Sequence, residues 1–290
     1  MLTSKNNAIL IDSGSYAIAR WGAERAAGRG VLVESFSHHD PQALARHLQR
    51  LPAGRRPVII ADGLCSICGC TAPLRAYAAL AKTTAGMLLI DDSQALGLLG
   101  ASPTPWKPYG LGGGGSLAWS GIRDAHILVI SSLAKAFGAP LAVLTGSAVQ
   151  VEIFARQSET RMHCSPPSLA DLCAAERALG LNNIRGDLLR ARLLALVKRF
   201  RHRMQQVGVR MVGGLFPVQT LATLTGEKAV RTWRQLREAG VNALLRQDHR
   251  RQPRLSFIVT SAHSPDDIDA AASILIATIF RPTLADTNKL

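Results

Sequence analysis

The chain has 290 residues, of which 47% are hydrophobic and 19% are charged, and this composition predicts a folded protein of one large or two unequal domains and excludes an intrinsically disordered one. No apolar run reaches the length of a membrane span, and the first residues contain no signal-peptide core. The five cysteines show no spacing typical of disulfides. We therefore expect a cytoplasmic protein without a membrane partner.

The net charge of +14 is concentrated in the second half of the chain. Residues 176–254 contain 17 Lys and Arg against 5 Asp and Glu. Such a surface could attract nucleic acid, a coenzyme A thioester or an acidic carrier protein. Because the arginines are scattered over several helix faces and lack interleaved aromatic residues, the pattern favours an ordinary solvated surface over a nucleic-acid site.

Strands and helices alternate through the first half of the chain. Asp40 followed by Pro41 is typical of a helix start, because the carboxylate can cap the helix and proline fits its first position. The alternation predicts a mostly parallel α/β sheet flanked by helices. The expected strands are 8–11, 31–34, 57–61, 87–90 and 126–130, and the expected helices are 15–27, 41–51 and 73–82.

The second half begins with a strand expected at 141–145 and a connector at 160–167. Two helices should follow, at 168–179 and 186–207, and the second has an apolar stripe at helical spacing. This stripe comprises Leu189, Leu193, Leu196, Phe200 and Met204. A small C-terminal α+β domain completes the chain, with strands near 217–219 and at 254–260 and helices at 228–239 and 265–280, the last capped by Ser264. The expected domains are 1–185 and 186–290.

A long segment rich in Pro and Gly, residues 102–120, precedes the strand at 126–130. Its Gly-rich run 112–116 could bind an anion, since successive glycine amides can converge on a phosphate. The run lacks the preceding strand and following helix of the known phosphate loops. We therefore expect a flexible loop in preference to a phosphate site.

A lysine, Lys135, closely follows the end of the strand at 126–130. A lysine at the end of a buried strand can be desolvated, which lowers its pKa and makes the amine a nucleophile towards carbonyls. Most lysines at such positions are solvated, so other features must support a catalytic role. One of these is the strand end at Asp91 and Asp92, because ligands of open α/β sheets lie at the carboxyl ends of strands.

Asp91 and Lys135 in one crevice would suit pyridoxal 5'-phosphate (PLP), with the lysine forming a Schiff base and the carboxylate keeping the pyridine nitrogen protonated. Residues 91–100 resemble the motif Asp-Asp/Glu-Ala-His-x-x-Gly-x-x-Gly, residues 132–138 resemble Thr/Ser-x-x-Lys-x-Phe/Leu-Gly, and residues 62–74 resemble Asp/Glu-Gly-Val-Phe-Ser-Met-Asp-Gly-Asp-x-Ala-Pro-Leu. These are motifs of the α-oxoamine synthases, fold-type-I PLP enzymes that include 8-amino-7-oxononanoate synthase, 2-amino-3-ketobutyrate CoA ligase and serine palmitoyltransferase.

The family's Phe-x-His-Asn-Asp motif also has a counterpart, at 36–40, and the resemblance extends from about Ile9 to Leu275. It implies a fold-type-I PLP-dependent transferase of class I/II, with residues 1–185 as the PLP-binding domain. The implied reaction is acyl transfer from a thioester to an amino-acid-derived carbanion, or transamination. An amine or amino acid would be the substrate, an acyl-CoA or acyl-carrier protein the acyl donor, and the chain a homodimer.

The resemblance also implies roles for individual residues. Lys135 would hold PLP and remove the α-proton, and Asp91 would stabilise the pyridinium. Ser132 would lie with Lys135 near the phosphate side, whereas Ser66 and Gln94 would lie near the ring oxygen. Glutamine replaces the family's histidine at position 94, so it can donate a hydrogen bond to that oxygen but cannot titrate.

The C-terminal segment departs from the family's Arg-x-Arg pattern, in which the second arginine binds the substrate carboxylate. That position is Ser256, and Arg254 lies two residues earlier on the same strand face. Arginine binds a carboxylate through two hydrogen bonds and serine does not, so Arg254 and Ser256 are the candidate substrate contacts. In the connector, Met162 and Cys164 occupy positions where the family's serines reach the cofactor phosphate of a second subunit.

Three cysteines, Cys65, Cys68 and Cys70, have a spacing that suggests metal ligands. No second ligand pair follows at a suitable spacing, and the family has Asp-Gly-Asp at 68–70, so we expect no metal site. His38 and His39 are expected to be loop residues before the helix at 41–51.

Compared with the family, the chain lacks roughly 100 N-terminal residues. Those residues would supply a Gly-rich phosphate turn, an aromatic residue that stacks on the cofactor and the first strand, and their loss would leave a sheet edge. Three explanations remain open: a misassigned start, a separate partner that supplies the segment, or a degenerate relative. The functional alternatives are a PLP-dependent transferase, a truncated non-catalytic partner or regulatory subunit, and a nucleic-acid-binding protein. The presence of Asp91 and Lys135 favours the enzyme.

Overall fold

The computed structural model describes residues 4–247 and 252–280, and the chain forms two compact units. Unit 1 comprises residues 1–65 and 71–187, and unit 2 comprises residues 66–70 and 188–290. The main division falls within helix α7 (Leu169–Gln206).

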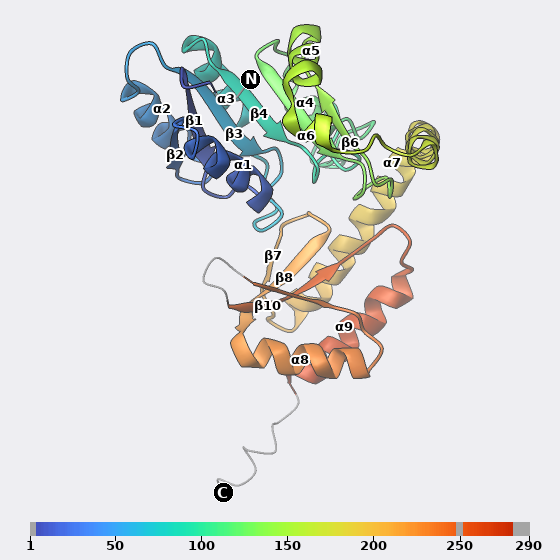
Figure 1. Cartoon of the computed structure of the whole chain (residues 1–290). Helices are drawn as coiled ribbons and strands as arrows, with labels where there is room; N and C mark the ends of the chain where they lie inside the picture. The colour runs from blue at the N-terminus through green and yellow to red at the C-terminus, as the bar shows by residue number, and fades with distance from the viewer. Residues whose placement is uncertain (1–3, 248–251, 281–290) are drawn as a thin grey trace, which may run out of the picture. The chain divides into compact units, whose positions relative to one another are not determined.

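Unit 1 contains a six-stranded sheet of order β2-β1-β3-β4-β5-β6 (Figure 1). Neighbouring strands from β2 to β5 run parallel, and β6 runs antiparallel to β5 at the end of the sheet. The expected α/β class with a mostly parallel sheet is therefore confirmed. The strands are β1 (Asn7–Asp12), β2 (Leu32–Phe36), β3 (Arg56–Asp62), β4 (Met87–Asp91), β5 (Ile127–Ser132) and β6 (Ala142–Thr145).

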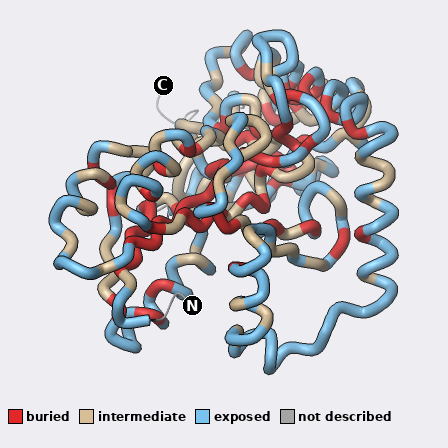
Figure 2. The backbone as a smooth tube through the Cα atoms, turned by 90° about the horizontal axis from the view of Figure 1, so that it is seen from above, coloured by how far each residue is buried: buried red, intermediate tan, exposed pale blue. Residues whose placement is uncertain are grey.

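Helices cover both faces of this sheet, and the buried positions run along its strands (Figure 2). Helix α1 (Ala17–Ala27) packs Ala23 and Ala26 against one face, and α2 (Pro41–Gln49) and α3 (Leu74–Thr83) pack against the other. Asp40 caps α2 as expected, because its carboxylate accepts hydrogen bonds from the backbone of Gln42 and Ala43, at 2.9 Å each.

Unit 2 has an antiparallel sheet of order β7-β8-β10-β9, formed by β7 (Met211–Val212), β8 (Val218–Thr225), β9 (Leu244–Gln247) and β10 (Pro253–Ile258). Its core combines this sheet with α8 (Gly226–Glu238), α9 (Pro265–Ile279) and the second half of α7. Three residues of the expected apolar stripe, Leu196, Phe200 and Met204, are buried there, whereas Leu189 is 38% exposed. Ser264 caps α9 as expected.

The prediction of two helices at 168–179 and 186–207 was wrong, because α7 is continuous over 38 residues. Two polar residues in or next to the expected gap between these helices are tied to the Gly-rich segment. The side-chain amide of Asn182 donates to the carbonyl of Gly112 at 3.0 Å, and the carboxylate of Asp187 accepts from its backbone N–H at 2.9 Å. These contacts offset the modest cost of glycines within a helix.

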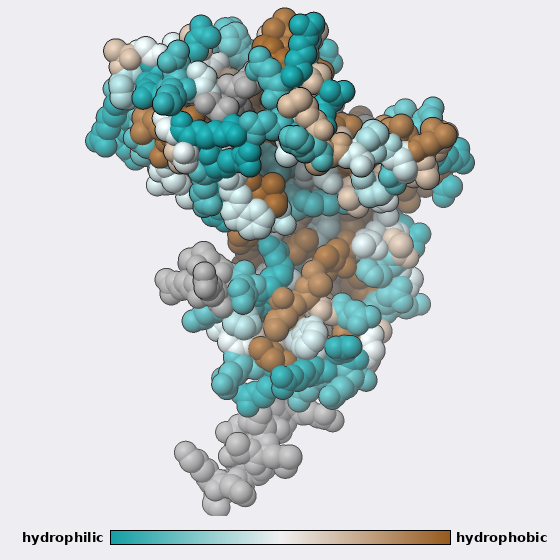
Figure 3. Space-filling view, in the orientation of Figure 1, coloured by the Kyte–Doolittle hydropathy of each residue, from teal (hydrophilic) through white to brown (hydrophobic). Residues whose placement is uncertain are grey.

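Short elements were also missed: α4 (Gly115–Ser120) inside the expected loop, α5 (Ala148–Gln157), α6 (Glu159–His163) inside the expected connector, and the strands β7 and β9. Apolar side chains remain exposed on α5 and on the first part of α7, among them Val149 and Leu169 (Figure 3). No helix in the described ranges combines the length and apolar character needed to cross a membrane.

Candidate functional site

Aspartates end three adjacent parallel strands of unit 1. Asp12 is the last residue of β1, Asp62 of β3 and Asp91 of β4. Asp62 and Asp91 are direct partners in the strand register, and Asp91 is also paired with Ile130 on β5. Three carboxyl groups therefore lie along the edge of the sheet where open α/β folds bind their ligands.

Lys135 lies in the turn that follows β5, the strand next to β4, and its side chain is exposed. Its Nζ lies 5.5 Å from the centre of the Tyr16 ring. The hydroxyl of Ser93, two residues after Asp91, accepts a hydrogen bond of 2.9 Å from the backbone N–H of Ser132, the last residue of β5. The ends of β4 and β5, which carry Asp91, Ser132 and Lys135, are thus joined directly.

Asp62 is the titratable group most strongly perturbed toward neutral pH at this edge. Burial raises its pKa to about 7, a hydrogen bond from the backbone N–H of Tyr16 lowers it, and the nearby Asp91 raises it again. That hydrogen bond is 3.2 Å long, and Asp62 is 8% exposed. Near neutral pH this carboxyl is therefore divided between its neutral and ionised forms. Sequence reasoning included Asp62 in a motif but gave it no role, because the pattern does not reveal its desolvation.

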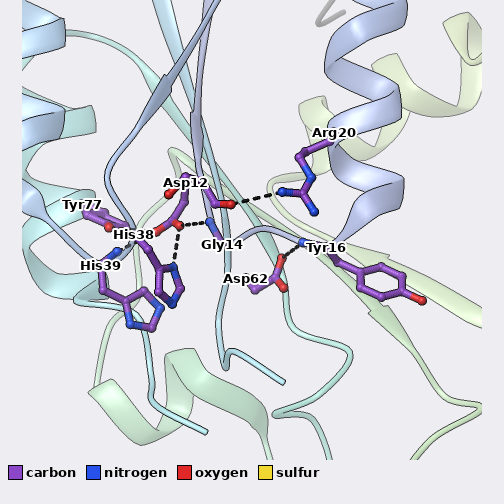
Figure 4. Close-up of polar contacts among 9 residues, drawn as sticks. Asp12, Gly14, Tyr16, Arg20, His38, His39, Asp62 and Tyr77 are labelled. Atoms are coloured by element: carbon purple, nitrogen blue, oxygen red, sulfur yellow. Dashed lines mark hydrogen bonds and ion pairs between the residues drawn. The ribbon is translucent and has the colours of Figure 1, made fainter. Parts of the chain in front are cut away.

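Tyr16 was also missed from the sequence. It is the N-cap of α1 and its side chain is 51% exposed, with the ring directed away from Asp62 (Figure 4). We expected the aromatic residue of the site to come from outside the chain, yet Tyr16 places an aromatic face beside the amine of Lys135. Its position four residues after Asp12, where β1 ends, is the signal that could have identified it.

Asp92, the second acidic residue of the motif, is buried and structural. Its carboxylate accepts hydrogen bonds from the backbone N–H of Ser116, at 3.0 Å, and from the Ser116 hydroxyl. Burial raises the pKa of Asp92, and the two bonds from Ser116 oppose that effect. The Gly-rich run is therefore anchored: Ser116 binds Asp92, Gly115 donates its N–H to the carbonyl of Leu99, and Gly112 binds α7. These amides are engaged with protein acceptors, so they do not support the phosphate alternative.

Asp12 organises a second polar cluster at the end of β1 (Figure 4). It is 1% exposed and accepts hydrogen bonds from His38 Nδ1 at 2.7 Å, from the backbone N–H of His39 at 3.0 Å and of Gly14 at 2.7 Å, and from the Tyr77 hydroxyl at 3.2 Å. Burial by itself lowers the pKa of His38, but Asp12 opposes it and the pKa is raised overall. Burial and the Asp12 charge also raise the pKa of Tyr77.

Two further residues were expected at the site, Gln94 and Ser66. Gln94 is half-buried in the turn after β4. Ser66 belongs to the segment grouped with unit 2, and its carbonyl accepts a hydrogen bond of 3.3 Å from Arg246 Nη1. The structure therefore brings Asp91, Ser132 and Lys135 together within unit 1 but assigns Ser66 to the other unit.

The two candidate substrate contacts lie on β10 in unit 2. Arg254 Nη1 donates a hydrogen bond of 3.0 Å to the carbonyl of Ala222. Ser256 is 0% exposed, and its hydroxyl lies 2.8 Å from that of Thr220 on β8. A fully buried hydroxyl that is already paired favours packing within the sheet over contact with a substrate.

The fold is that of the PLP-dependent transferases of fold type I. The structure is similar to serine palmitoyltransferase from Sphingomonas wittichii, with a TM-score of 0.83 and 18% identity over 96% of this chain and 67% of that one. It is also similar to 8-amino-7-oxononanoate synthase from Francisella tularensis, with a TM-score of 0.72 and 20% identity over 95% of this chain and 76% of that one.

Sequence comparison identifies the family. The model for "Aminotransferase class I and II" matches residues 1–275, and the chain belongs to this family of PLP-dependent transferases. Similar relatives include the 8-amino-7-oxononanoate synthases of Alkalilimnicola ehrlichii, 28% identical over 256 residues, and of Pseudomonas putida, 30% identical over 239 residues. The alignments cover 85% and 81% of this chain but only 61% and 54% of the respective relatives.

Proposed function

We propose that this chain acts as a PLP-dependent transferase of the α-oxoamine synthase type, which joins an acyl group from a thioester to the α-carbon of an amino acid or related amine. The observation that carries the proposal is the placement of the Lys135 amine and the Asp91 carboxylate at the ends of neighbouring strands, with the Tyr16 ring beside the amine. The synthases similar to this chain support the same class of reaction.

The residues of this edge fit PLP. Lys135 offers an exposed amine to the cofactor's aldehyde, Asp91 offers a carboxylate to its pyridine nitrogen, and the Tyr16 ring offers an apolar face to its ring. Ser132 and Gln94 provide a hydroxyl and an amide for the polar substituents. When bound, the cofactor would supply an electron sink for negative charge that develops at the substrate's α-carbon.

Each protein group would have a defined task in the reaction. Lys135 would hold the cofactor covalently and, once displaced by the substrate amine, its free Nζ would accept the α-proton. Asp91 would offer its carboxylate to the pyridine nitrogen. The Asp91 charge also raises the pKa of Asp62, so the pair would carry one full negative charge more readily than two. Asp62 would position Tyr16 by accepting the hydrogen bond from the Tyr16 backbone N–H.

For the substrate carboxylate we retain Arg254 over Ser256, because only Arg254 offers a charged, partly exposed side chain. An acyl-CoA or acyl-carrier protein would be the acyl donor. A homodimer is the proposed assembly, and exposed apolar residues on α1 and β5 support it: Ile18 is 59%, Trp21 60% and Ile130 39% exposed.

A PLP titration of the purified chain, read by visible absorption and followed by borohydride reduction and peptide mapping, tests the proposal. We expect a stable adduct at Lys135 that is absent in Lys135→Ala. Lys107→Ala is the matched control, since Lys107 is an exposed lysine of the same unit, and it should retain the adduct. Equal labelling of wild type and Lys135→Ala would reject the proposal and leave a non-catalytic partner or regulatory subunit as the better alternative.

A further inference from the structure

Unit 1 has a surface pocket that the proposed PLP site does not use. Its volume is about 530 Å³, within the range of roughly 300–1,000 Å³ that is usual for small-molecule sites. Neither Lys135 nor Asp91 lines it. The lining residues with polar or aromatic side chains are His39, Thr71, Arg75, Trp119 and Ser120. These side chains have no role in the reaction proposed above, so the pocket is a candidate for a second ligand.

The walls of the pocket come from segments that are far apart in the sequence. His39 follows the end of β2, residues 71–76 lead into α3, and Trp119 lies on α4. The segment before α3 returns to the end of β3, since the backbone N–H of Ala72 donates a hydrogen bond of 3.2 Å to the carbonyl of Gly63. The pocket therefore lies beside the carboxyl ends of strands, the edge at which open α/β sheets bind ligands.

Arg75 brings a positive charge to the pocket, and no Asp or Glu is among the lining residues. In the part of the chain that the structure describes, its guanidinium makes no ion pair and no hydrogen bond. The guanidinium lies against Gly121 at the end of α4, where an added Cβ would be 3.2 Å from Nη2. An arginine held at a cavity without a carboxylate partner favours an anionic ligand, because guanidinium binds carboxylates and phosphates through paired hydrogen bonds.

Trp119 offers an apolar ring to the same ligand. Its indole N–H donates a hydrogen bond of 2.8 Å to the carbonyl of Pro108, so the polar atom of the ring is already engaged. The same bond holds the ring in place at the pocket. What remains for a ligand is the aromatic surface, against which a flat ring can pack.

Neutral polar groups complete the lining. Thr71 and Ser120 offer hydroxyls, which both donate and accept hydrogen bonds. Burial lowers the pKa of His39, and the neighbouring His38, on which its ring is stacked, lowers it further, so the imidazole of His39 is uncharged at neutral pH (Figure 4). The backbone of His39 is held by the hydrogen bond of 3.0 Å from its N–H to Asp12. These groups suit the hydroxyls of a sugar as well as the oxygens of an anion.

We propose that this pocket binds a nucleotide, with its phosphate at Arg75 and its base against Trp119. A nucleotide joins a phosphate to a flat ring through a hydroxylated sugar, so it matches the cation, the aromatic surface and the neutral polar groups together. An anion without a ring, or a ring without an anion, would use only part of the lining. Free nucleotides and the nucleotide end of coenzyme A share this chemistry, and the test separates them. The inference does not depend on PLP binding.

The test is calorimetric titration of the purified full-length chain, without PLP, with AMP and separately with coenzyme A. We expect saturable binding of AMP that weakens as salt is added, because salt screens the charge of an exposed arginine. Adenosine and inorganic phosphate, which each carry one part of the ligand, should bind at least about tenfold more weakly than AMP. Tighter binding of coenzyme A than of AMP would assign the pocket to the nucleotide end of the coenzyme, and the reverse order would assign it to a free nucleotide.

Variants of two residues and one control locate the site. Arg75→Ala should weaken the binding of AMP and coenzyme A by about 10–100-fold without changing the melting temperature, because the side chain is exposed. Arg50→Ala, which removes an exposed arginine of the same unit, should leave binding unchanged.

Trp119→Leu should weaken binding by about fivefold or more, whereas Trp119→Phe, which loses the same hydrogen bond but keeps a ring, should bind more tightly than Trp119→Leu. The proposal is overturned if the wild-type chain binds neither AMP nor coenzyme A, if Arg75→Ala binds them as tightly as wild type, or if adenosine or phosphate alone binds as tightly as AMP.

Discussion

Polar residues occupy different positions in the two sheets. In unit 1 the aspartates stand at the carboxyl ends of parallel strands, where Asp91 is half-buried and Lys135 in the following turn is exposed. In unit 2 polar residues lie within antiparallel strands and are paired inside the protein. Gln219 and Ser256 are both 0% exposed, and their side chains bind Arg201 and Thr220, respectively.

The difference follows from how each sheet is covered. Helices pack over the faces of the parallel sheet and leave its strand ends open, so polar groups there can meet a ligand. A polar side chain inside the antiparallel sheet faces the core, where it must find a partner within the protein. Whether a polar residue lies at a strand end is therefore a better guide to a role in ligand binding than its match to one position of a family motif.

Among the substitutions in unit 1, we expect that of Lys135 to lower turnover the most. Lys135→Ala should lower kcat by about 10²–10⁴-fold through loss of the proposed catalytic base, and more where the proposed covalent cofactor binding is also lost. Because the side chain is exposed, the melting temperature without cofactor should hardly change. Thiol release from an acyl-CoA in the presence of amino acids measures turnover, and full activity in the variant would contradict the assignment.

Asp91→Asn should have the next largest effect, lowering kcat by about 10²–10³-fold, because it removes the carboxylate that we propose stabilises a protonated pyridine nitrogen. The comparison variant is Ser256→Ala, which should leave kcat and KM close to wild type. Steady-state kinetics of both variants, prepared with excess PLP, compares the effect of a substitution in unit 1 with that of one in unit 2. A larger loss of kcat for Ser256→Ala than for Asp91→Asn would contradict the assignment of the catalytic residues to unit 1.

Asp62 should make stability depend on pH. Its folded pKa of about 7 lies above the ordinary value of 3.8, so the folded state binds the proton more tightly and loses stability as the pH rises from 3.8 through about 7. Between pH 5 and pH 8 this loss is on the order of 2–3 kcal/mol, and Asp62→Asn should remove it. Urea denaturation at both pH values measures the difference, with Asp266→Asn, an exposed aspartate, as the control. Parallel pH dependence in wild type and Asp62→Asn would show that Asp62 is not perturbed.

Ser256→Ala should have the smallest effect, a loss of about 1–2 kcal/mol in the free energy of unfolding, since it leaves the hydroxyl of Thr220 without its partner. The double variant Ser256→Ala/Thr220→Val should recover part of this loss, because both polar groups are then absent. Chemical denaturation of the single and double variants provides the measurement. If the single variant is as stable as wild type, the hydroxyl pair contributes nothing and Ser256 becomes available for another role.

Much of unit 1 could be predicted from local patterns. The strands of the sheet and the cap at Asp40 follow from apolar runs and capping residues, and the shared edge of Asp91 and Lys135 follows from the rule for parallel sheets. The continuity of α7 was not predicted, and the hydrogen bonds of Asn182 and Asp187 with Gly112 join segments that are distant in the sequence.

The parts of the site that were missed depend on contacts between distant segments. The pKa of Asp62 results from burial by neighbouring elements, and Tyr16 belongs to the site only because α1 begins next to the end of β3. The meeting of His39, Arg75 and Trp119 at one pocket likewise depends on the folded sheet, which spacing along the chain does not encode.

The last strand of the large sheet has a practical consequence for work with this chain. β6 has four residues, Ala142, Val143, Leu144 and Thr145, and none carries a charge. It stands at the end of the strand order, and natural proteins usually protect such strands with lysine, proline or a bulge. Without a charge, a proline or a bulge, such an edge strand can pair with extended backbone from another molecule. We therefore expect solubility to limit concentrated preparations of the chain, and a peptide or a charged substitution that masks β6 to improve it.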